Sequence, residues 1–449
     1  MSQPALKNKN TFSAGGVHPD EHKERTADSP IEPFPVSERL TVPLLQHIGA
    51  PASPVVKRKD EVKMGQVIGE AQGFISAAVH SPVSGKVRKV TTCTHNPTGK
   101  QVPAIVIEND GEEEWADGCD EQQDVGAMEP SQMVELVQEA GIVGLGGATF
   151  PAHVKLSPPS HSPITDVFIN GAECEPYVTC DHRLMVEETH DILDALRLMM
   201  RMVGASRGHI GIEENKPDAI QAFADAIGDD SDVAVHPLEV KYPQGAEQQL
   251  IKAVTGREVP DEGGLPADVG CLVHNVATAI AIRDAIRFRR PLIERAVTVT
   301  GEGVRDAGNF VIRMGTSLEE VVQRQGILEG TNMIVLGGPM MGVSQGDLNV
   351  PLIKGNNAVL LLKKAEQEAQ RACIRCGRCV EHCPLRLVPS NISMACENQD
   401  WDSALEANIL ECKECGCCAY VCPANRKIVQ QIKFGKAEVA KRKKKQEEE

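Results

Sequence analysis

Eight cysteines near the C-terminus have the spacing of ligands for iron–sulfur clusters. The motif CxxCxxCxxxCP occurs twice, from Cys373 to Pro384 and from Cys412 to Pro423. Thiolates suit the soft iron of a cubane cluster, and each [4Fe–4S] cluster takes four of them. Zinc sites usually show CxxC pairs separated by a dozen or more residues, which is a different pattern. The spacing therefore predicts two [4Fe–4S] clusters.

The ligands are expected to cross between the two runs. In bacterial ferredoxins with this motif, three cysteines wrap one cluster and the fourth, just before proline, reaches the other cluster. We therefore expect one cluster to be held by Cys373, Cys376, Cys379 and Cys422, and the other by Cys383, Cys412, Cys415 and Cys418. Two adjacent clusters would pass electrons one at a time.

Composition narrows the remaining possibilities. A chain of 449 residues is long enough for three or four domains. A net charge of −16 and only 3% aromatic residues argue against nucleic-acid binding. The seven cysteines outside the motifs show no pairing pattern, which fits a reducing cytoplasm. The N-terminus has no apolar signal region and no run of 18 apolar residues occurs, so we expect no signal peptide and no membrane span.

The first two segments have the patterns of an arm and a small β-domain. Residues 1–39 are rich in Pro, Glu and Lys and predict an extended N-terminal arm. Residues 40–110 contain short β-runs whose two halves resemble the β-sandwich (barrel-sandwich hybrid) of lipoyl and biotinyl carrier domains. Those domains carry a modifiable lysine at a hairpin tip, whereas the interval Gly73–Ala77 has none. We expect a sandwich without a swinging cofactor.

Residues 131–292 alternate strand and helix patterns, which predicts a mostly parallel sheet. Helices are expected at Ser131–Ala140, Thr189–Val203 and Pro217–Ile227, and each is stopped by a glycine. The glycine-rich stretch from Gly144 to Pro151 would let backbone N–H groups approach a phosphate or a flavin edge. Polar residues follow the strand 166–170, at the sheet edge where α/β domains bind ligands.

The remaining segments are shorter. Residues 293–350 predict a small α+β module with a capping box at Ser317. Residues 366–435 hold the cysteine motifs. Residues 436–449 are expected to be a charged, solvated tail, and the alternative is that its basic run contacts anionic lipid or an acidic partner.

Several sequence blocks, taken in order, resemble the NADH-oxidising flavoprotein subunit of complex I: Gly144–Lys155, Ile169–Arg183, Tyr242–Gly256, Val273–Thr278 and Thr298–Ser317. With the arm motif Gly15–Pro19, the segment Pro43–Gly49, the sandwich and the twin cysteine runs, residues 12–436 resemble the RnfC subunit of the Rnf ion-translocating electron-transport complex more closely. That resemblance implies a Rossmann-like FMN/NAD domain, an ubiquitin-like (SLBB) module and a ferredoxin-like domain with two [4Fe–4S] clusters. It also implies a ferredoxin:NAD oxidoreductase component, peripheral on the cytoplasmic side of the cell inner membrane, whose partners are the other Rnf subunits and, indirectly, ferredoxin.

The resemblance also implies roles for individual residues. The loop that holds the flavin phosphate and ring is matched by Gly144, Gly146, Gly147 and Lys155. Flavin-edge contacts are matched by Asn170, Glu173 and Asn275. Carboxylates that position the nicotinamide nucleotide are matched by Glu175 and Glu247, and an aromatic near the adenine by Phe150. Tyr242 and Gly245 are assigned to cofactor binding with their block.

Three departures from the complex I pattern keep other functions open. Alanines stand at positions 172 and 246, where that pattern has acids, and Leu156 follows Lys155 in place of a second aromatic. These changes weaken the expectation of NAD(H) binding more than that of FMN binding. An electron relay that does not use NAD is therefore an alternative. A corrinoid-reducing flavoprotein shares the flavin domain and the clusters but lacks the preceding arm and sandwich.

Overall fold

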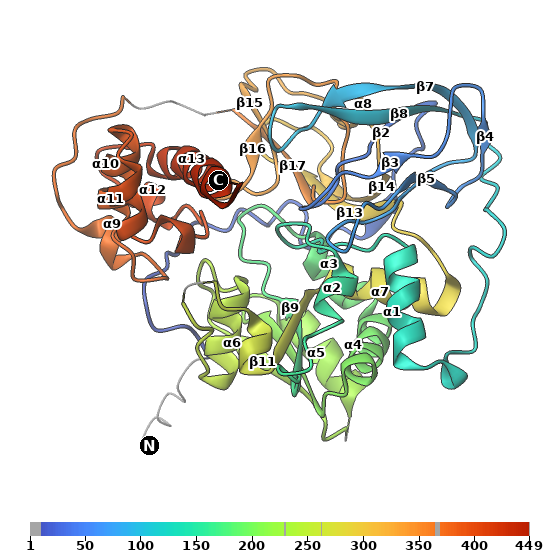
Figure 1. Ribbon diagram of the computed structural model, residues 1–449, viewed down its shortest axis with the longest axis horizontal. Helices are drawn as coiled ribbons and strands as arrows, with labels where there is room; N and C mark the ends of the chain where they lie inside the picture. The colour runs from blue at the N-terminus through green and yellow to red at the C-terminus, as the bar shows by residue number, and fades with distance from the viewer. Residues whose placement is uncertain (1–9, 229, 262, 364–368, 449) are drawn as a thin grey trace.

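The computed structural model of the chain describes residues 10–228, 230–261, 263–363 and 369–448 (Figure 1). Residues 1–9 of the expected arm, residues 366–368 of the expected cysteine domain and Glu449 lie outside the described part. The longest axis of the molecule has the cysteine-rich helices at one end and the β-sandwich at the other (Figure 1). The parallel-sheet domain and a second β-sheet lie between these two ends.

The N-terminal domain is the expected β-sandwich. One sheet has the strand order β2–β8–β7–β4 and the other the order β3–β5–β6. The strands are β2 (Arg39–Pro43), β3 (Ser53–Pro54), β4 (Glu61–Val62), β5 (Val67–Glu70), β6 (Val79–His80), β7 (Gly85–Thr94) and β8 (Gln101–Asn109). Apolar residues from both sheets fill the core. At the hairpin tip the carbonyl oxygen of Phe74 accepts a hydrogen bond from His153 Nε2 at 3.0 Å. The tip is thus docked on the next domain.

The central domain is built on a fully parallel sheet of order β11–β10–β9–β12, as predicted. Its strands are β9 (Asp166–Gly171), β10 (Arg207–Glu213), β11 (Val233–Leu238) and β12 (Cys271–Asn275). One side of the sheet shares a core with α1 (Pro130–Glu139), α4 (Thr189–Val203), α5 (Pro217–Ile227) and α7 (Val276–Phe288). The other side packs on α6 (Glu247–Thr255). Short turns of helix lie at η1 (Val125–Ala127), α2 (Ala152–Lys155) and η2 (Pro266–Val269).

A six-stranded sheet follows, with the order β1–β14–β13–β17–β15–β16. Its strands are β1 (Ile31–Pro33), β13 (Glu294–Thr300), β14 (Gly308–Arg313), β15 (Met333–Leu336), β16 (Val343–Ser344) and β17 (Ala358–Leu362). Helix α8 (Leu318–Gln325), capped by Ser317 as expected, covers one face, and α3 (Cys180–Glu187) packs on the other. The predicted limits of 293–350 were wrong, because β17 lies inside the sheet and the arm supplies β1.

The cysteine-rich segment is helical, and residues 369–448 contain no strand. Its elements are α9 (Arg378–Glu381), α10 (Pro389–Glu397), α11 (Trp401–Glu406), η3 (Ile409–Glu411), α12 (Cys417–Tyr420) and α13 (Ile428–Glu448). The segment from residue 436, predicted to be a charged, solvated tail, continues helix α13, and residues 440–443 of it are exposed. Val439 is fully buried against the core of this segment and holds that part of the helix in place.

Candidate electron-transfer site

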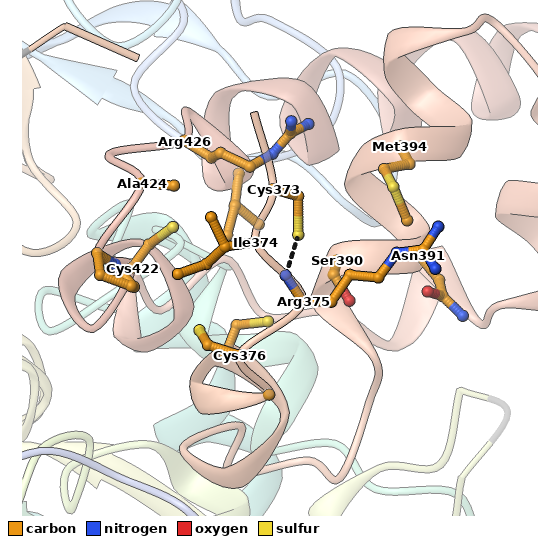
Figure 2. Close-up of a pocket in the computed structure, with 14 residues that line it drawn as sticks. Cys373, Ile374, Arg375, Cys376, Ser390, Asn391, Met394, Cys422, Ala424 and Arg426 are labelled. Atoms are coloured by element: carbon orange, nitrogen blue, oxygen red, sulfur yellow. Dashed lines mark hydrogen bonds between the residues drawn. The ribbon is translucent and has the colours of Figure 1, made fainter. Parts of the chain in front are cut away.

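Four cysteines surround one cavity of about 370 Å³ in the cysteine-rich segment. Cys376 there is exposed, and the neighbouring Ile374 is 67% exposed. Among the described residues no Asp or Glu lines this cavity, whereas Arg375 and Arg426 do. Figure 2 shows side chains from the first motif, from α10 and from the stretch before α13 around the same space. We call this space the first cavity. The cysteines that line it are Cys373, Cys376, Cys379 and Cys422.

The other four motif cysteines surround a second, narrower cavity of about 20 Å³. Cys418 and Cys383 are at most 8% exposed, and burial raises the pKa of the Cys412 thiol to about 11. Bound iron ions would favour the thiolate form there. The motif cysteines that line this second cavity are Cys383, Cys412, Cys415 and Cys418, and Cys417, which lies outside the motif spacing, lines it as well. The motif cysteines thus lie in two groups that match the crossed sets, and their role as cluster ligands stays a prediction.

The two cavities are built by the same local backbone, repeated 39 residues apart. In each loop a backbone N–H donates to the first cysteine sulfur at 3.4 Å, from Arg375 to Cys373 and from Glu414 to Cys412. In each loop the glycine after the second cysteine has a positive φ, which is +79° at Gly377 and +89° at Gly416. The repeated backbone therefore follows the repeated spacing of the two motifs.

The second cavity lies against the parallel-sheet domain. Tyr242, which is 2% exposed, donates its hydroxyl to the carbonyl oxygen of Cys415 at 2.7 Å. Gln249 Nε2 donates to the carbonyl oxygen of Pro384 at 3.0 Å. The arm closes the same junction, since the backbone N–H of Gly16 donates to the carbonyl oxygen of His382 at 3.0 Å. The first cavity has no such cover in the part of the chain that the structure describes.

The glycine loop of the parallel-sheet domain has the openness that a bound phosphate or ring would need. Gly146 and Gly147 are exposed, and a Cβ atom placed on Gly147 would meet nothing within 4 Å. The backbone N–H of Gly144 donates to the carbonyl oxygen of Phe150 at 2.9 Å, which folds the loop back on itself. The ammonium group of Lys155, at the end of α2, pairs with the carboxylate of Glu247.

Asparagines frame the edge of the sheet below this loop. Asn170, at the end of β9, donates to the carbonyl oxygen of Gly245 at 2.7 Å. Asn275 caps α7 and donates through Nδ2 to Asp181 Oδ2 at 2.6 Å. A Cβ atom on Gly146 would lie 2.7 Å from the side chain of Asn275, so only glycine allows the loop to approach this closely. Glycine loop, lysine and amides thus converge at the carboxyl edge of the parallel sheet.

The two predicted carboxylates of the 173–175 segment point in different directions. Glu173 caps α3, because the backbone N–H of Asp181 donates to its Oε1 at 2.7 Å. Glu175 accepts from the backbone N–H groups of Met340 and Met341, both at 3.0 Å. Burial raises the pKa of each of these carboxyls to about 7. Glu175 therefore fastens the loop after β15 beside the second cavity.

Sequence reasoning did not identify several residues of this region. Lys23 of the arm is 9% exposed and donates to the carbonyl oxygen of Glu173 at 2.8 Å. Cys417, outside the motif spacing, is fully buried beside Tyr242. Neither a lone lysine in a polar arm nor a spare cysteine carries a local signal, because the contacts involve residues more than a hundred positions away.

Comparisons with known proteins agree with this architecture. Residues 137–284 match the family described as the Nuo51 FMN-binding domain, and residues 11–112 match the RnfC barrel sandwich hybrid domain. The structural likeness to an NAD+-reducing [NiFe]-hydrogenase is weaker, with a TM-score of 0.49 and 16% identity over 71% of this chain and 61% of that chain. The two family matches and the fold define a multidomain α/β protein with a barrel-sandwich domain and an FMN-binding domain.

Full-length relatives narrow the class to one family. The chain is 44% identical to the C subunit of the proton-translocating ferredoxin:NAD(+) oxidoreductase complex of Clostridium ljungdahlii, over 94% of this chain and 93% of that protein. It is 43% identical to the Na(+)-translocating counterpart of Acetobacterium woodii, over 95% and 96%. It is 41% identical to the C subunit of the ion-translocating oxidoreductase complex of Rhodobacter capsulatus, over 95% and 83%. The chain belongs to the RnfC family. Among its described residues no helix is both long and apolar enough to cross a membrane.

Proposed function

We propose that this chain is the peripheral electron-transfer subunit of an Rnf-type complex, which exchanges electrons between NAD(H), FMN and two [4Fe–4S] clusters. Other subunits would couple this exchange to ion translocation and to ferredoxin, at the cytoplasmic side of the inner membrane. The observation that carries the proposal is the junction between the second cavity and the FMN-binding domain, where Tyr242 bonds directly to the Cys415 loop. Redox centres on the two sides of this junction would be neighbours.

The cysteine sets fit two cubane clusters by their chemistry. Four motif thiols line each cavity, and the backbone N–H bonds to Cys373 and Cys412 would stabilise ligating thiolates. The first cavity is roomy, whereas the cysteines of the second would have to rotate apart to admit a cluster. The segment would be a ferredoxin-like two-cluster domain in its ligand pattern, carried on a helical frame, and the six-stranded sheet would be the SLBB-type module.

The glycine loop fits FMN. Open space beside Gly147 would admit a phosphate or a ring, Gly144 and Gly146 let the loop fold back on Phe150 and approach Asn275, and Lys155 supplies the positive charge. Asn170 and Asn275 present amides at the same edge. A flavin bound here would supply the conversion of a two-electron hydride transfer into single-electron steps. The residues orient the cofactor, and none needs to act as an acid or base in the hydride step.

Dinucleotide binding rests on fewer contacts. Glu247 is 40% exposed at its side chain and is held by Lys155, so it is accessible to a ligand at the loop. Phe150 is half-buried at the end of the same loop. Glu175 is committed to the Met340 loop, so its role toward NAD(H) would be indirect. A relay without NAD is the second candidate, favoured by Ala172 and Ala246. The barrel-sandwich domain disfavours a corrinoid reductase.

An anaerobic titration tests the proposal. The full chain, loaded with iron, sulfide and FMN, is titrated with NADH while flavin absorbance and the cluster EPR signal are followed. We expect flavin bleaching followed by a reduced-cluster signal. If flavin is bound and the clusters are intact but neither signal changes on addition of NADH, electron exchange with NAD(H) would be contradicted and the relay without NAD would be favoured. Lys155→Met should weaken FMN binding, whereas Lys252→Met, which removes a lysine of α6 that pairs with Glu258, is the matched control.

A further inference from the structure

Five ionisable side chains are buried together between the arm and the parallel-sheet domain. Their exposed fractions are 9% or less. Burying charged groups costs several kcal/mol each unless they are well paired, so such a cluster demands a reason. One comes from the arm, two from the segment 173–181 and two from the end of β10 and the turn after it: Lys23, Glu173, Asp181, Glu213 and Lys216.

Two carboxylate oxygens in this cluster have no hydrogen-bond partner among the described residues. They are Oδ1 of Asp181 and Oε1 of Glu213, and both are buried. The other oxygen of Glu213 lies 3.2 Å from the ammonium group of Lys216. A buried carboxylate oxygen without a donor is stabilised when it takes up a proton.

Glu173 links the other members of the cluster. A carboxylate oxygen of Glu173 and one of Asp181 lie within 4.8 Å of each other. Oε2 of Glu173 lies 3.7 Å from the ammonium group of Lys23. Three acidic groups and two ammonium groups therefore share one buried region, and the acids outnumber the bases.

The outer end of the cluster opens into a cavity of about 200 Å³. Lys23, Glu173 and Glu213 line it, together with His18, whose side chain is exposed. This volume is large enough for several water molecules, which hydrogen-bond readily to such walls. Protons on Glu173 or Glu213 could therefore exchange with solvent.

The inner end of the cluster adjoins the glycine loop. Asp181 Oδ2 accepts from Asn275, and Asn275 touches the backbone at Gly146. Carboxylates thus extend from the proposed FMN loop to the cavity: Asp181 lies next to Glu173, and Glu173 and Glu213 both line the cavity. Apart from the five members, the nearby buried cation is Arg295, which acts on Asp181 electrostatically.

The stoichiometry of the proposed function requires such an outlet. A hydride leaving NADH carries two electrons and one proton, and NAD(+) is the product. Iron–sulfur clusters accept the two electrons and leave the proton behind. One proton must therefore leave the domain for every NADH oxidised, or enter it when electrons flow the other way.

We propose that Asp181, Glu173 and Glu213, with Lys23 beside Glu173, conduct this proton between the FMN-binding domain and the cavity. The inference rests on the proposed function of NAD-linked electron transfer. Desolvation raises the pKa of Glu173 to about 7 against the opposing charge of Lys23, which suits proton exchange near neutral pH. Glu173 also faces Lys216 and Asp181, and the latter raises its pKa further.

Stopped-flow mixing of the fully loaded chain with NADH tests the route. NADH absorbance, cluster reduction and proton release to an indicator dye are recorded in weak buffer. Wild type should release one proton per NADH in step with cluster reduction. In Glu173→Gln, proton release should lag behind cluster reduction in the same sample and be slower than in wild type by about tenfold or more. Glu24→Gln, which removes an exposed carboxylate next to Lys23, is the matched control and should match wild type.

Infrared titration of the oxidised, loaded protein gives a readout that needs no NADH. Protonated-carboxyl absorbance should titrate near neutral pH in wild type, with Glu173 and Glu175 both contributing, and Glu173→Gln should lose the Glu173 part of it. Lys23→Met should move that titration to higher pH, because the ammonium group favours the ionised carboxylate. If Lys23→Met does not fold, Glu213→Gln tests the outer carboxylate, and slower proton release is expected.

The results of these experiments would separate the proton route from the proposed NAD-linked function. Proton release at the wild-type rate in Glu173→Gln, or no band near neutral pH that depends on Glu173, would overturn the route. A purely structural cluster that only pins the arm would alter unfolding and leave both readouts unchanged. Failure of wild type to oxidise NADH would contradict the proposed function instead, while the infrared titration would still decide whether Glu173 exchanges a proton.

Discussion

The two cysteine cavities share a backbone and differ in their surroundings. The first is open, is bordered by arginines and has an exposed cysteine at its edge. The second is narrow and is covered by the Tyr242 loop, the Met340 loop and the arm. The same ligand motif therefore yields one site directed at the FMN-binding domain and one directed at solvent. The packing partners, and not the motif, assign an inner and an outer position.

The largest expected effect comes from removing two ligands at a time in double variants. Cys383→Ala with Cys415→Ala removes cysteines from one cavity only and should leave about half of the iron bound, because each of the two proposed [4Fe–4S] clusters would hold four of eight irons. Cys383→Ala with Cys376→Ala removes a ligand from each and should leave little iron. Iron analysis and EPR measure both.

If the ligands did not cross, the results of these two double variants would be exchanged. Cys396→Ala is the control, because this cysteine is buried in the same segment and lines neither cavity. Its iron content should equal that of wild type.

The second-largest effect is expected from iron removal, which should distinguish the two cavities. A chelator with mild oxidant should take iron in two phases of similar size, with the first cavity losing its iron faster because Cys376 is exposed. In Cys422→Ala the fast phase should disappear. A single phase in wild type would argue that the two cavities are equally accessible.

Substitution of the equivalent glycines of the two cysteine loops should have smaller effects, on the free energy of unfolding. Alanine at Gly377 or Gly416 costs about 1 kcal/mol because of the positive φ. A Cβ atom at Gly416 would also lie 2.9 Å from the carbonyl oxygen of Met340, whereas at Gly377 it meets nothing within 4 Å. We expect Gly416→Ala to be less stable than Gly377→Ala by roughly a further 1–3 kcal/mol in chemical unfolding. Equal losses would mean that the Met340 loop yields easily.

The smallest effect is expected at the hydroxyl of Tyr242. Tyr242→Phe keeps the ring and removes one hydrogen bond to Cys415, which should cost about 1 kcal/mol. Reduction of the second cluster should slow while the iron content stays unchanged. Tyr420→Phe, on an exposed tyrosine of α12, controls for the loss of a hydroxyl. Identical cluster reduction in the two variants would argue that this contact does not join the domains.

Where the sequence pattern of an element was local, the sequence was sufficient to predict that element. Helices α4 and α5 have the predicted limits, because their apolar period and their glycine stops lie within a few residues. The parallel direction of the strands was predicted from the alternation of strands and helices. The course of the C-terminal helix was missed because its basic run hides a single apolar anchor, Val439.

The sequence by itself determined the cysteine spacing, the glycine loop and the alternation of strands and helices, since each depends on short-range geometry. Only the tertiary structure decided that Glu175 bonds to the Met340 loop, that Lys23 enters the parallel-sheet domain and that the second cavity is the covered one. Those facts depend on contacts between residues far apart in the chain. No local pattern specifies such contacts, because burial and pairing are properties of the packed molecule.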